Sequence, residues 1–484
     1  MKKKILFFCA IPSQFPELFP LARTLGETEN FCPIFVFDSS RGDHNGCIKS
    51  CLEHEIPCVN QLNQDIRFDS INTENDLEKV TTYKKDFWSG IIRKYLPNWL
   101  IRILYLIFNL SSTFKYVGTN VVLSQKIIDS YRPDLIIVPI ETVGYFYDPI
   151  IPLADKAEIP VLVIPFCFVK TASTANWFLS QPAFADVYSC QRLTNRLVGK
   201  LFPRWVIEKD GNKVLRANFA WVLAYQYYKI ASKNPWIDNS GYSTSIAVES
   251  IYAAELYKNE GVPPDKIRVT GSLLHDIMYR LLSRKSEYKK ELFKELGFHF
   301  NSNIKLVVLS FPDEFDFSNR PGCEYTTHEE IRREMLQPFI RYEHVKIVIL
   351  PHPRLNYDKI TGLEQADIRI SKRTIAEILP CADLFVTVTS AVIRHAIACA
   401  VPVIDYDVFQ YGDRYYSNAG GVLTVDSKKD YCAFVEKIIS DDELYSKLKT
   451  LQVKASILWG KPDGEAGTRV IGLINEMIDK ENKV

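Results

Sequence analysis

The stretch from residue 345 to residue 405 constrains the fold more than any other part of the chain. It contains three short apolar runs rich in β-branched residues, VKIVIL, DLFVTV and VPVI, at 345–350, 383–388 and 401–404. Runs of this length without polar alternation are typical of parallel strands that are buried on both faces. The segment 391–400 has helical composition, so the stretch predicts the alternating strands and helices of an α/β domain.

Polar side chains follow the first two of these runs. His352 and Arg354 come after the first run, in Pro351-His352-Pro353-Arg354, and Thr389-Ser390 comes after the second. Ligands of parallel α/β sheets bind outside the carboxyl ends of the strands, so we expect these side chains on one rim. An imidazole, a cation and two hydroxyls beside a helix N-terminus suit a phosphate.

Each of these residues also has a structural interpretation, which the sequence leaves open. Thr389 and Ser390 suit an ordinary helix N-cap, and Arg354 suits a surface ion pair. Arg394, one turn further on, either adds positive potential to the rim or lies on the exposed face of its helix. His352 at a strand end is either a phosphate ligand or a structural histidine.

With 484 residues the chain is long enough for two α/β domains. Further strand-like runs occur at 5–11, 32–38, 134–140, 160–166 and 304–311, and the segment 297–303 is the best linker. We predict an N-terminal Rossmann-like domain, 1–300, with insertions near 41–130 and 170–242. A C-terminal Rossmann-like domain, 304–465, and a terminal helix, 466–484, complete the predicted architecture.

No cofactor or metal site is predicted. The loop after the first strand reads CAIPSQFPE and lacks the GxGxxG pattern, which disfavours a dinucleotide. The eight histidines occur without HxH or HExxH spacing, and the one DxD triplet is Asp405-Tyr406-Asp407. Isolated triplets of this kind arise by chance, so the sequence predicts no metal site.

Composition and charge exclude several classes of protein. The net charge of +1 gives no reason to expect nucleic acid as a partner. Eleven cysteines without a CxxC pair predict free thiols in a reducing compartment, hence a cytoplasmic protein. The apolar stretch near the N-terminus, 5–11, has no cleavage site after it, and this is typical of a first strand rather than an export signal. No apolar run reaches the roughly 20 residues that a spanning helix needs.

The segment 87–116 mixes tryptophan, tyrosine and phenylalanine with arginine and lysine. Such a segment is typical of a helix that lies peripherally on the inner face of a membrane. A long helix packed on the N-terminal domain is the favoured interpretation, and membrane contact stays open as the alternative.

Glu141 is the candidate general base. It falls at the carboxyl end of the run 134–140, where a carboxylate faces any cleft between the domains. A carboxylate at this position can instead cap a loop or pair with an arginine.

Three motifs together resemble the GT-B superfamily, which includes nucleotide-sugar glycosyltransferases and UDP-N-acetylglucosamine 2-epimerases. They are EGVPPDKIRVTGS at 260–272, PHPR at 351–354 and the AD…TSA…VPVI run at 382–404, each within a Rossmann-like half. The resemblance leaves out the segments 41–130 and 170–242. It implies two domains facing across a cleft, with the terminal helix packed back on the first domain.

The chain is most similar to bacterial enzymes of surface-polysaccharide synthesis. In bacterial sialyltransferases and some capsule glycosyltransferases, a His-Pro pair and a later Ser/Thr pair hold the phosphate and nucleotide of a CMP-linked donor. His352-Pro353 and Thr389-Ser390 match these pairs, which implies a catalytic role for His352. Gly271 and Ser272, in the first motif, are further candidates for donor binding. The acidic pair Asp313-Glu314 departs from the pattern, since no glycine follows it.

The resemblance therefore implies a glycosyltransferase that moves a sugar from a CMP- or UDP-linked donor to a surface polysaccharide or lipid-linked acceptor. A sugar-nucleotide 2-epimerase or hydrolase is the alternative, because Glu141 and the stretch 269–276 also match that family. However, 390–395 reads SAVIRH, without the two glycines and the ribose-binding glutamate of the epimerases. The expected acidic residue is also missing at 166–168, which reads FCF. A non-catalytic scaffold is the third possibility.

Overall fold

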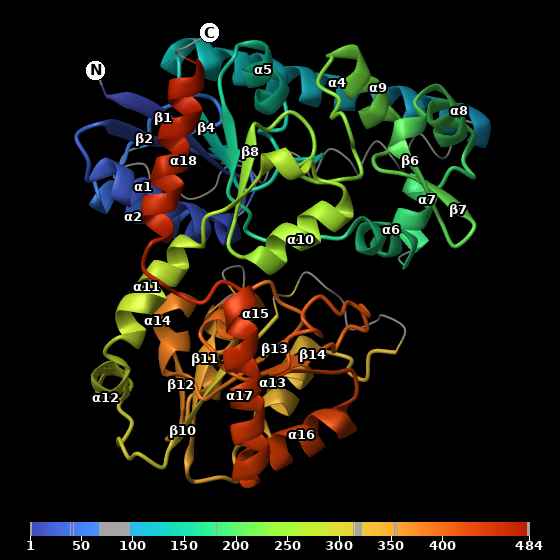
Figure 1. Cartoon of the computed structure of the whole chain (residues 1–484). Helices are drawn as coiled ribbons and strands as arrows, with labels where there is room; N and C mark the ends of the chain where they lie inside the picture. The colour runs from blue at the N-terminus through green and yellow to red at the C-terminus, as the bar shows by residue number, and fades with distance from the viewer. Residues whose placement is uncertain are drawn as a thin grey trace.

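The computed structural model in Figure 1 describes residues 2–38, 40–41, 43–66, 97–180, 182–312, 314, 322–352, 355 and 357–481. The chain forms two α/β domains, one above the other in the figure. In the described residues each domain is built on one parallel sheet, of seven and six strands respectively. The predicted fold class, two Rossmann-like domains, is confirmed.

The N-terminal sheet has the strand order β3-β2-β1-β4-β5-β8-β9. Successive residues of its central strand face opposite sides: Ile5 and Phe7 pack in one core cluster, and Leu6 and Phe8 pack in another. This two-sided burial is the reason that the strands read as continuous apolar runs. The strands are β1 (Lys3–Cys9), β2 (Phe31–Phe37), β3 (Cys58–Asn60), β4 (Leu135–Val138), β5 (Val161–Val163), β8 (Ser245–Val248) and β9 (Ile267–Val269).

Helices cover both faces of this sheet (Figure 1). They are α1 (Phe15–Gly26), α2 (Asn45–Glu53), α4 (Asn98–Tyr131), α5 (Ile150–Lys156) and α10 (Ile251–Glu260). Gly261, at φ +101°, ends α10 in the left-handed conformation that glycine adopts without strain.

The C-terminal sheet has the order β12-β11-β10-β13-β14-β15, the 3-2-1-4-5-6 arrangement of nucleotide-binding folds. Its strands are β10 (Lys305–Ser310), β11 (Val345–Leu350), β12 (Ile368–Ile370), β13 (Leu384–Thr387), β14 (Val403–Tyr406) and β15 (Val422–Val425). Its helices are α13 (His328–Leu336), α14 (Ile375–Ile378), α15 (Ile393–Ala398), α16 (Lys428–Ser440) and α17 (Asp442–Leu458).

A small helical subdomain occupies the chain between β5 and β8. It consists of α6 (Thr171–Ser180), α7 (Pro182–Tyr188), α8 (Leu193–Leu201), the antiparallel pair β6 (Val206–Lys209) and β7 (Asn212–Leu215), and α9 (Phe219–Tyr227). Its core surrounds the buried Trp205 and includes Val117 from the middle of α4. The long helix α4 therefore joins this subdomain to the main sheet.

Two helices connect the domains. The helix α11 (Leu273–Leu282) places Leu273 in the core of the N-terminal domain and Met278 in the core of the C-terminal domain, where α12 (Lys285–Glu295) follows it. The last helix, α18 (Ala466–Glu481), returns to the first domain, where Val470 and Ile474 pack against the β1 side of its sheet.

The first turns of α4 lie in the predicted membrane-contact segment, of which residues 97–116 are described. Tyr105, Ile107 and Phe108 are 70%, 58% and 65% exposed there, so this part of the helix is not packed on the domain. Further along, Val117 is buried. Among the described residues, no helix combines the length and apolar character needed to cross a bilayer.

We predict that Ile474→Ala lowers the free energy of unfolding by about 2–4 kcal/mol, because the side chain is fully buried between α18 and the sheet. Urea denaturation measures this change. Asp479→Ala on the same helix removes only a surface ion pair with Lys3 and should change the free energy by less than about 1 kcal/mol. Equal effects of the two substitutions would show that α18 does not anchor the domain.

Candidate functional site

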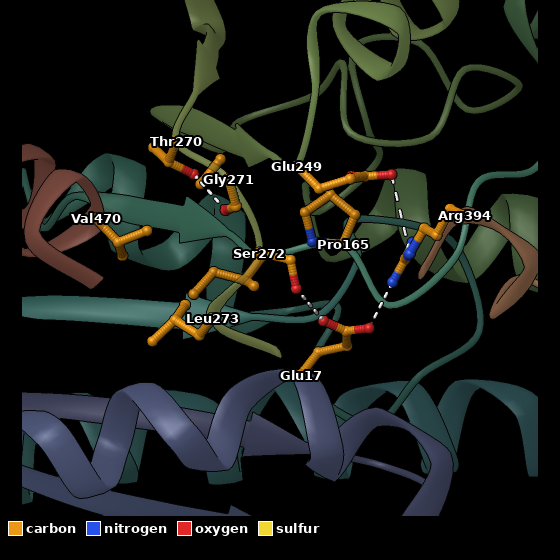
Figure 2. A pocket seen from close by; sticks show the side chains of 11 residues that line it. Glu17, Pro165, Glu249, Thr270, Gly271, Ser272, Leu273, Arg394 and Val470 are labelled. Carbon is orange, nitrogen blue, oxygen red and sulfur yellow. Dashed lines mark hydrogen bonds and ion pairs between the residues drawn. The ribbon is translucent and has the colours of Figure 1, made fainter. Parts of the chain in front are cut away.

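A buried ion pair joins the two domains. Glu17 lies in the first turn of α1, and Arg394 lies on α15 of the other domain; Arg394 Nη2 is 2.5 Å from Glu17 Oε1 (Figure 2). Arg394 Nε is also 3.8 Å from the carboxylate of Glu249, and Nη2 donates to the carbonyl of Phe166. Arg394 is only 4% exposed, so these N-terminal groups, and not solvent, satisfy its charge.

Two histidines extend this network within α15 and α11. His395 Nε2 is 3.1 Å from Glu17 Oε1, and His275 Nε2 is 3.0 Å from His395 Nδ1. Burial lowers the pKa of His275 well below its usual value, and His395 beside it lowers it further. A neutral His275 that donates to His395, which in turn donates to Glu17, satisfies both contacts.

The charges of the pair determine the pKa of Glu17. Burial alone would raise this pKa, but Arg394 and His395 outweigh burial and lower it to about 2. Glu17 is therefore ionised throughout the physiological range. Sequence reasoning did not single out Glu17, since one glutamate in a first helical turn is a common feature that helix capping explains.

Gly271 and Ser272 belong to this contact between the domains. Ser272 begins α11 as its N-cap, and its hydroxyl donates to Glu17 Oε2 at 3.3 Å. Gly271, at φ +87°, packs against Ala466 and Arg469 at the start of α18. The pocket that these residues line in Figure 2 has a volume of about 10 Å³, the size of one water molecule. The predicted roles of Gly271, Ser272 and Arg394 toward a donor stay predictions.

A much larger pocket, of about 480 Å³, opens between the domains beside this contact. Thr389, Ser390 and Asp405 line it from the C-terminal domain, and Arg216 lines it from the helical subdomain. The remaining lining residues are mainly aromatic or small and polar: Cys167, Phe168, Val169, Ser173, Thr174, Trp177, Phe178, Ala391, Tyr411, Asp413, Tyr415 and Tyr416. An apolar wall with a few convergent polar groups is typical of small-molecule sites.

Contacts between the domains also close one edge of this pocket. The hydroxyl of Ser173 donates to Asp413 Oδ1 at 2.6 Å, and the hydroxyl of Tyr415 donates to Ser173 Oγ at 2.7 Å. The backbone N–H of Lys170 donates to the Tyr415 hydroxyl at 3.3 Å. The pocket is therefore complete only when the two domains adopt this relative position.

Thr389 has an unusual conformation for a threonine. Its φ of +33° lies in the left-handed region, which a β-branched residue rarely adopts. Its N–H donates to Asp405 Oδ1 at 2.9 Å, whereas its hydroxyl oxygen is buried without a hydrogen-bond partner in the described part of the chain. Strain and an unsatisfied polar group at one position are features of ligand sites. Because this turn occupies residues 389–392, α15 begins two residues later than predicted.

In the triplet Asp405-Tyr406-Asp407, the side chains of Tyr406 and Asp407 make contacts that stabilise the fold. Asp407 accepts hydrogen bonds from the N–H groups of Tyr411 and Gly412, both at 2.8 Å, and pairs with Arg414 at 3.3 Å. Tyr406 points into the core, where its ring stacks on Tyr431. No group of three or more metal-ligating side chains occurs in the residues that the structure describes.

Asp405 is a buried carboxyl at the pocket wall. Burial raises its pKa to about 7, and the Asp407 carboxylate nearby also raises it, against the effect of the Thr389 N–H. A carboxyl with a pKa near 7 exchanges protons readily at neutral pH. From the sequence, Asp405 was considered only as part of the triplet Asp405-Tyr406-Asp407. Its position directly after the apolar run 401–404 is the signal that could have placed it near the rim.

Arg216 also was not singled out from the sequence. Its guanidinium donates to Thr142 Oγ1 at 2.8 Å and lies 3.4 Å from Asp238, and it faces the rings of Phe178 and Trp236. It lies in the segment 170–242, which the sequence predicted only as an insertion in the N-terminal domain. In the structure, residues of this segment form one wall of the pocket.

His352 lies at the end of β11, half-buried, and Pro353 and Arg354 lie outside the described residues. Because β10 lies between β11 and β13, His352 and Thr389 follow strands that are two places apart, about 10 Å. The two residues share the rim at the carboxyl ends of the strands. His352 is not among the residues that line the 480 Å³ pocket.

Glu141 follows β4, and its side chain is buried at 7% exposure. The carboxylate accepts from the N–H groups of Gly241, Tyr242 and Ser243, at 3.1, 2.5 and 3.2 Å, and from the Ser243 hydroxyl at 2.6 Å. These four bonds fix the loop before β8. The role of Glu141 as a general base stays a prediction. In this structure its carboxylate holds the loop 241–243 in place.

Comparisons with known proteins show the fold. No protein-family model matches the sequence, and no curated protein matches it significantly. Among solved structures, the UDP-GlcNAc 2-epimerase from Neisseria meningitidis bound to UDP-GlcNAc is 14% identical with a TM-score of 0.55, over 98% of this chain and 100% of that chain. The glycotransferase of kitacinnamycin is 12% identical with a TM-score of 0.52, over 99% of this chain and 100% of that chain.

The wall teichoic acid polymerase TagF, solved with CDPG, is 11% identical with a TM-score of 0.50, over 99% of this chain and 89% of that chain. At such identities the likeness establishes a shared fold. The protein therefore has the two-domain fold of GT-B glycosyltransferases and UDP-sugar 2-epimerases, as the sequence motifs indicated.

We predict that Glu17→Gln lowers the free energy of unfolding by about 3 kcal/mol at neutral pH, since it leaves Arg394 buried without its main counter-charge. The folded-state pKa of Glu17, about 2, lies below the usual glutamate value of 4.5. The stabilisation is thus present above about pH 4.5 and is lost as the pH falls toward about 2.

Urea denaturation of the wild type and the variant at several pH values measures this difference. Glu27→Gln is the matched control, because Glu27 ends the same helix in an exposed ion pair with Arg23. A difference between wild type and Glu17→Gln that stays constant from about pH 7 to about pH 3 would contradict the assignment.

We also predict that the free energy of unfolding falls less with rising pH in Asp405→Asn than in the wild type. A carboxyl whose pKa rises to about 7 on folding stabilises the protein below its unfolded pKa of 3.8, and this contribution is lost as the pH rises through 7. The contribution changes by about 2–3 kcal/mol between about pH 5 and about pH 8. Denaturation at both pH values tests this, and identical pH dependence in wild type and variant would contradict it.

Proposed function

We propose that the protein is a glycosyltransferase that moves a sugar from a CMP- or UDP-linked donor to a surface polysaccharide or lipid-linked glycan. The proposal includes activity without a metal ion or other cofactor, in the reducing cytoplasm. The observation that carries it is the 480 Å³ pocket between the domains, which lies at the carboxyl end of β13. Solved proteins of this fold include one bound to UDP-GlcNAc and one with CDPG.

In this proposal the C-terminal domain binds the donor phosphate. The hydroxyls of Thr389 and Ser390 donate to phosphate oxygens, and the unsatisfied Thr389 hydroxyl gains the partner that it otherwise lacks. His352, with Pro353 and Arg354 after it, supplies positive charge from the next part of the rim and stabilises the leaving nucleotide. The aromatic wall from α6 faces them across the pocket and suits the flat face of a base or sugar.

Two carboxyl groups are candidates for the general base. Glu141 can take this role only if the loop 241–243 releases its carboxylate. Asp405 already lines the pocket, and its pKa of about 7 suits proton transfer at neutral pH. We therefore prefer Asp405 as the residue that accepts the proton of the acceptor hydroxyl.

The 2-epimerase alternative is supported by the likeness in fold to UDP-GlcNAc 2-epimerases. The turn at 389–392 contains no glycine, and the stretch 390–395 offers no glutamate for a ribose; its His395 contacts Glu17 and His275. The missing glycines and glutamate favour the transferase. The two activities differ in their need for an acceptor, so one assay separates them.

The prediction of membrane contact through 87–116 is part of the proposal for the acceptor. A lipid-linked acceptor lies at a bilayer surface, and the exposed apolar side chains of Tyr105, Ile107 and Phe108 are suited to such a surface.

The experiment is a turnover assay with CMP- and UDP-sugars, with and without glycan acceptor, in the presence of EDTA. We predict that turnover depends on the acceptor. It should fall at least about tenfold in Thr389→Val and in His352→Ala, because each substitution removes one charge-assisted contact with the donor. Thr389→Val keeps the shape of the side chain and removes no hydrogen bond of the described structure, so a loss of turnover reports on the ligand.

Thr424→Val, a substitution of the same kind on β15, is the control and should keep full turnover. Consumption of UDP-sugar without any acceptor would favour the epimerase. Absence of nucleotide binding in a calorimetric titration would favour a scaffold protein.

A further inference from the structure

One face of α8 carries a stripe of exposed leucines. Leu193, Leu197 and Leu201 follow at intervals of four residues and are 66%, 54% and 70% exposed. Residues four apart lie on the same side of a helix, one above the other. The opposite face, with Asn195 and Val198, is buried in the subdomain core. Single exposed leucines are ordinary, but an aligned row forms a continuous apolar surface.

A row of cations runs beside these leucines. Each leucine follows directly after a basic residue, in Arg192-Leu193, Arg196-Leu197 and Lys200-Leu201, and Arg204 continues the row one turn beyond the helix. From residue 187 to residue 207 the sequence contains no aspartate or glutamate. Within the described residues, Arg192 is the only one of the four cations that makes an ion pair, with Asp186.

The start of α4 adds exposed apolar groups at the same end of the domain. Both α4 and α8 pack on α9, and Figure 1 shows the first turns of α4 and α8 together at the end of the domain farthest from α18. Tyr227, at the end of α9, is a further aromatic side chain with 70% exposure.

We propose that α8 is a docking helix for an anionic lipid bilayer, with its leucine stripe in the interfacial region and its cations on the lipid headgroups. The charge pattern selects this occupant. A protein–protein contact through the leucines alone does not explain the row of basic residues beside them. An anionic lipid surface does, because it attracts each basic side chain near it. The arrangement, an apolar row flanked by lysine and arginine, is that of helices that lie in the plane of a membrane. The inference concerns a surface that does not line the pocket. It adds a bilayer contact to the one proposed for 87–116 and does not depend on the glycosyltransferase activity.

The test is co-sedimentation of the full-length protein with vesicles of phosphatidylcholine alone or mixed with phosphatidylglycerol. We expect binding to the anionic vesicles and little binding to the neutral ones. The variant Leu193→Ser/Leu197→Ser/Leu201→Ser should bind at least about tenfold more weakly. Arg196→Gln/Lys200→Gln should lose the preference for anionic vesicles, and salt at about 1 M should weaken wild-type binding because it screens surface charge.

The matched control is Val453→Ser/Ile457→Ser/Leu458→Ser on α17, which removes three apolar side chains of 48%, 66% and 53% exposure from the other domain. All these side chains are at the surface, so circular dichroism should show unchanged folding. Three results would overturn the proposal: no binding by the wild type, equal losses in the α8 and α17 variants, or a leucine-dependent dimer in solution that leaves vesicle binding unaffected.

Discussion

The buried contact between Glu17 and Arg394 holds the two domains in their relative position. The two residues are 377 positions apart in sequence, and no solvent reaches either charge appreciably. A buried ion pair of this kind adds little net stability, because desolvation offsets most of the attraction. It does, however, penalise every arrangement of the domains that leaves one of the charges alone. The ion pair therefore mainly fixes the relative orientation of the two domains. The hydrogen bonds of Ser272 and His395 to the same carboxylate stabilise this orientation further.

The large pocket is a consequence of this orientation. One wall belongs to the turn at 389–391, and the other belongs to α6 and Arg216. The link from Ser173 to Asp413 and Tyr415 then closes one edge. One hydrogen bond joins the strained Thr389, which follows β13, to the buried Asp405 on β14, near the carboxyl ends of the two strands. The chemistry that we propose, phosphate binding beside a carboxyl of raised pKa, follows from these neighbours.

The sequence predicted the fold class and the strands because both depend on local composition. Val345–Leu350 is both the predicted and the observed strand. The boundaries of the apolar runs at 5–11, 32–38, 134–140 and 160–166 differ from those of β1, β2, β4 and β5 by one to three residues. The rim with His352 and Thr389 follows from the rule for parallel sheets. Their separation does not, because chain order does not reveal that β10 lies between their strands.

The partners of individual polar residues could not be predicted, since they come from segments far apart in the chain. The sequence offered Arg394 as a cation for a ligand, and only the position of α1 shows that Glu17 takes this charge. Glu141 likewise meets a loop about 100 residues later. Arg216 and the aromatic wall lie in a segment without a recognisable pattern, and their role depends on how the helical subdomain folds back toward the other domain.

Amide hydrogen exchange in the presence of CMP and UDP tests the central claim, that a nucleotide binds between the domains, most directly. The account predicts that exchange slows in the peptides covering residues 387–395 and 167–178, on both walls of the pocket, and stays unchanged around Glu141. Protection confined to other segments, or no protection at saturating nucleotide, would contradict it.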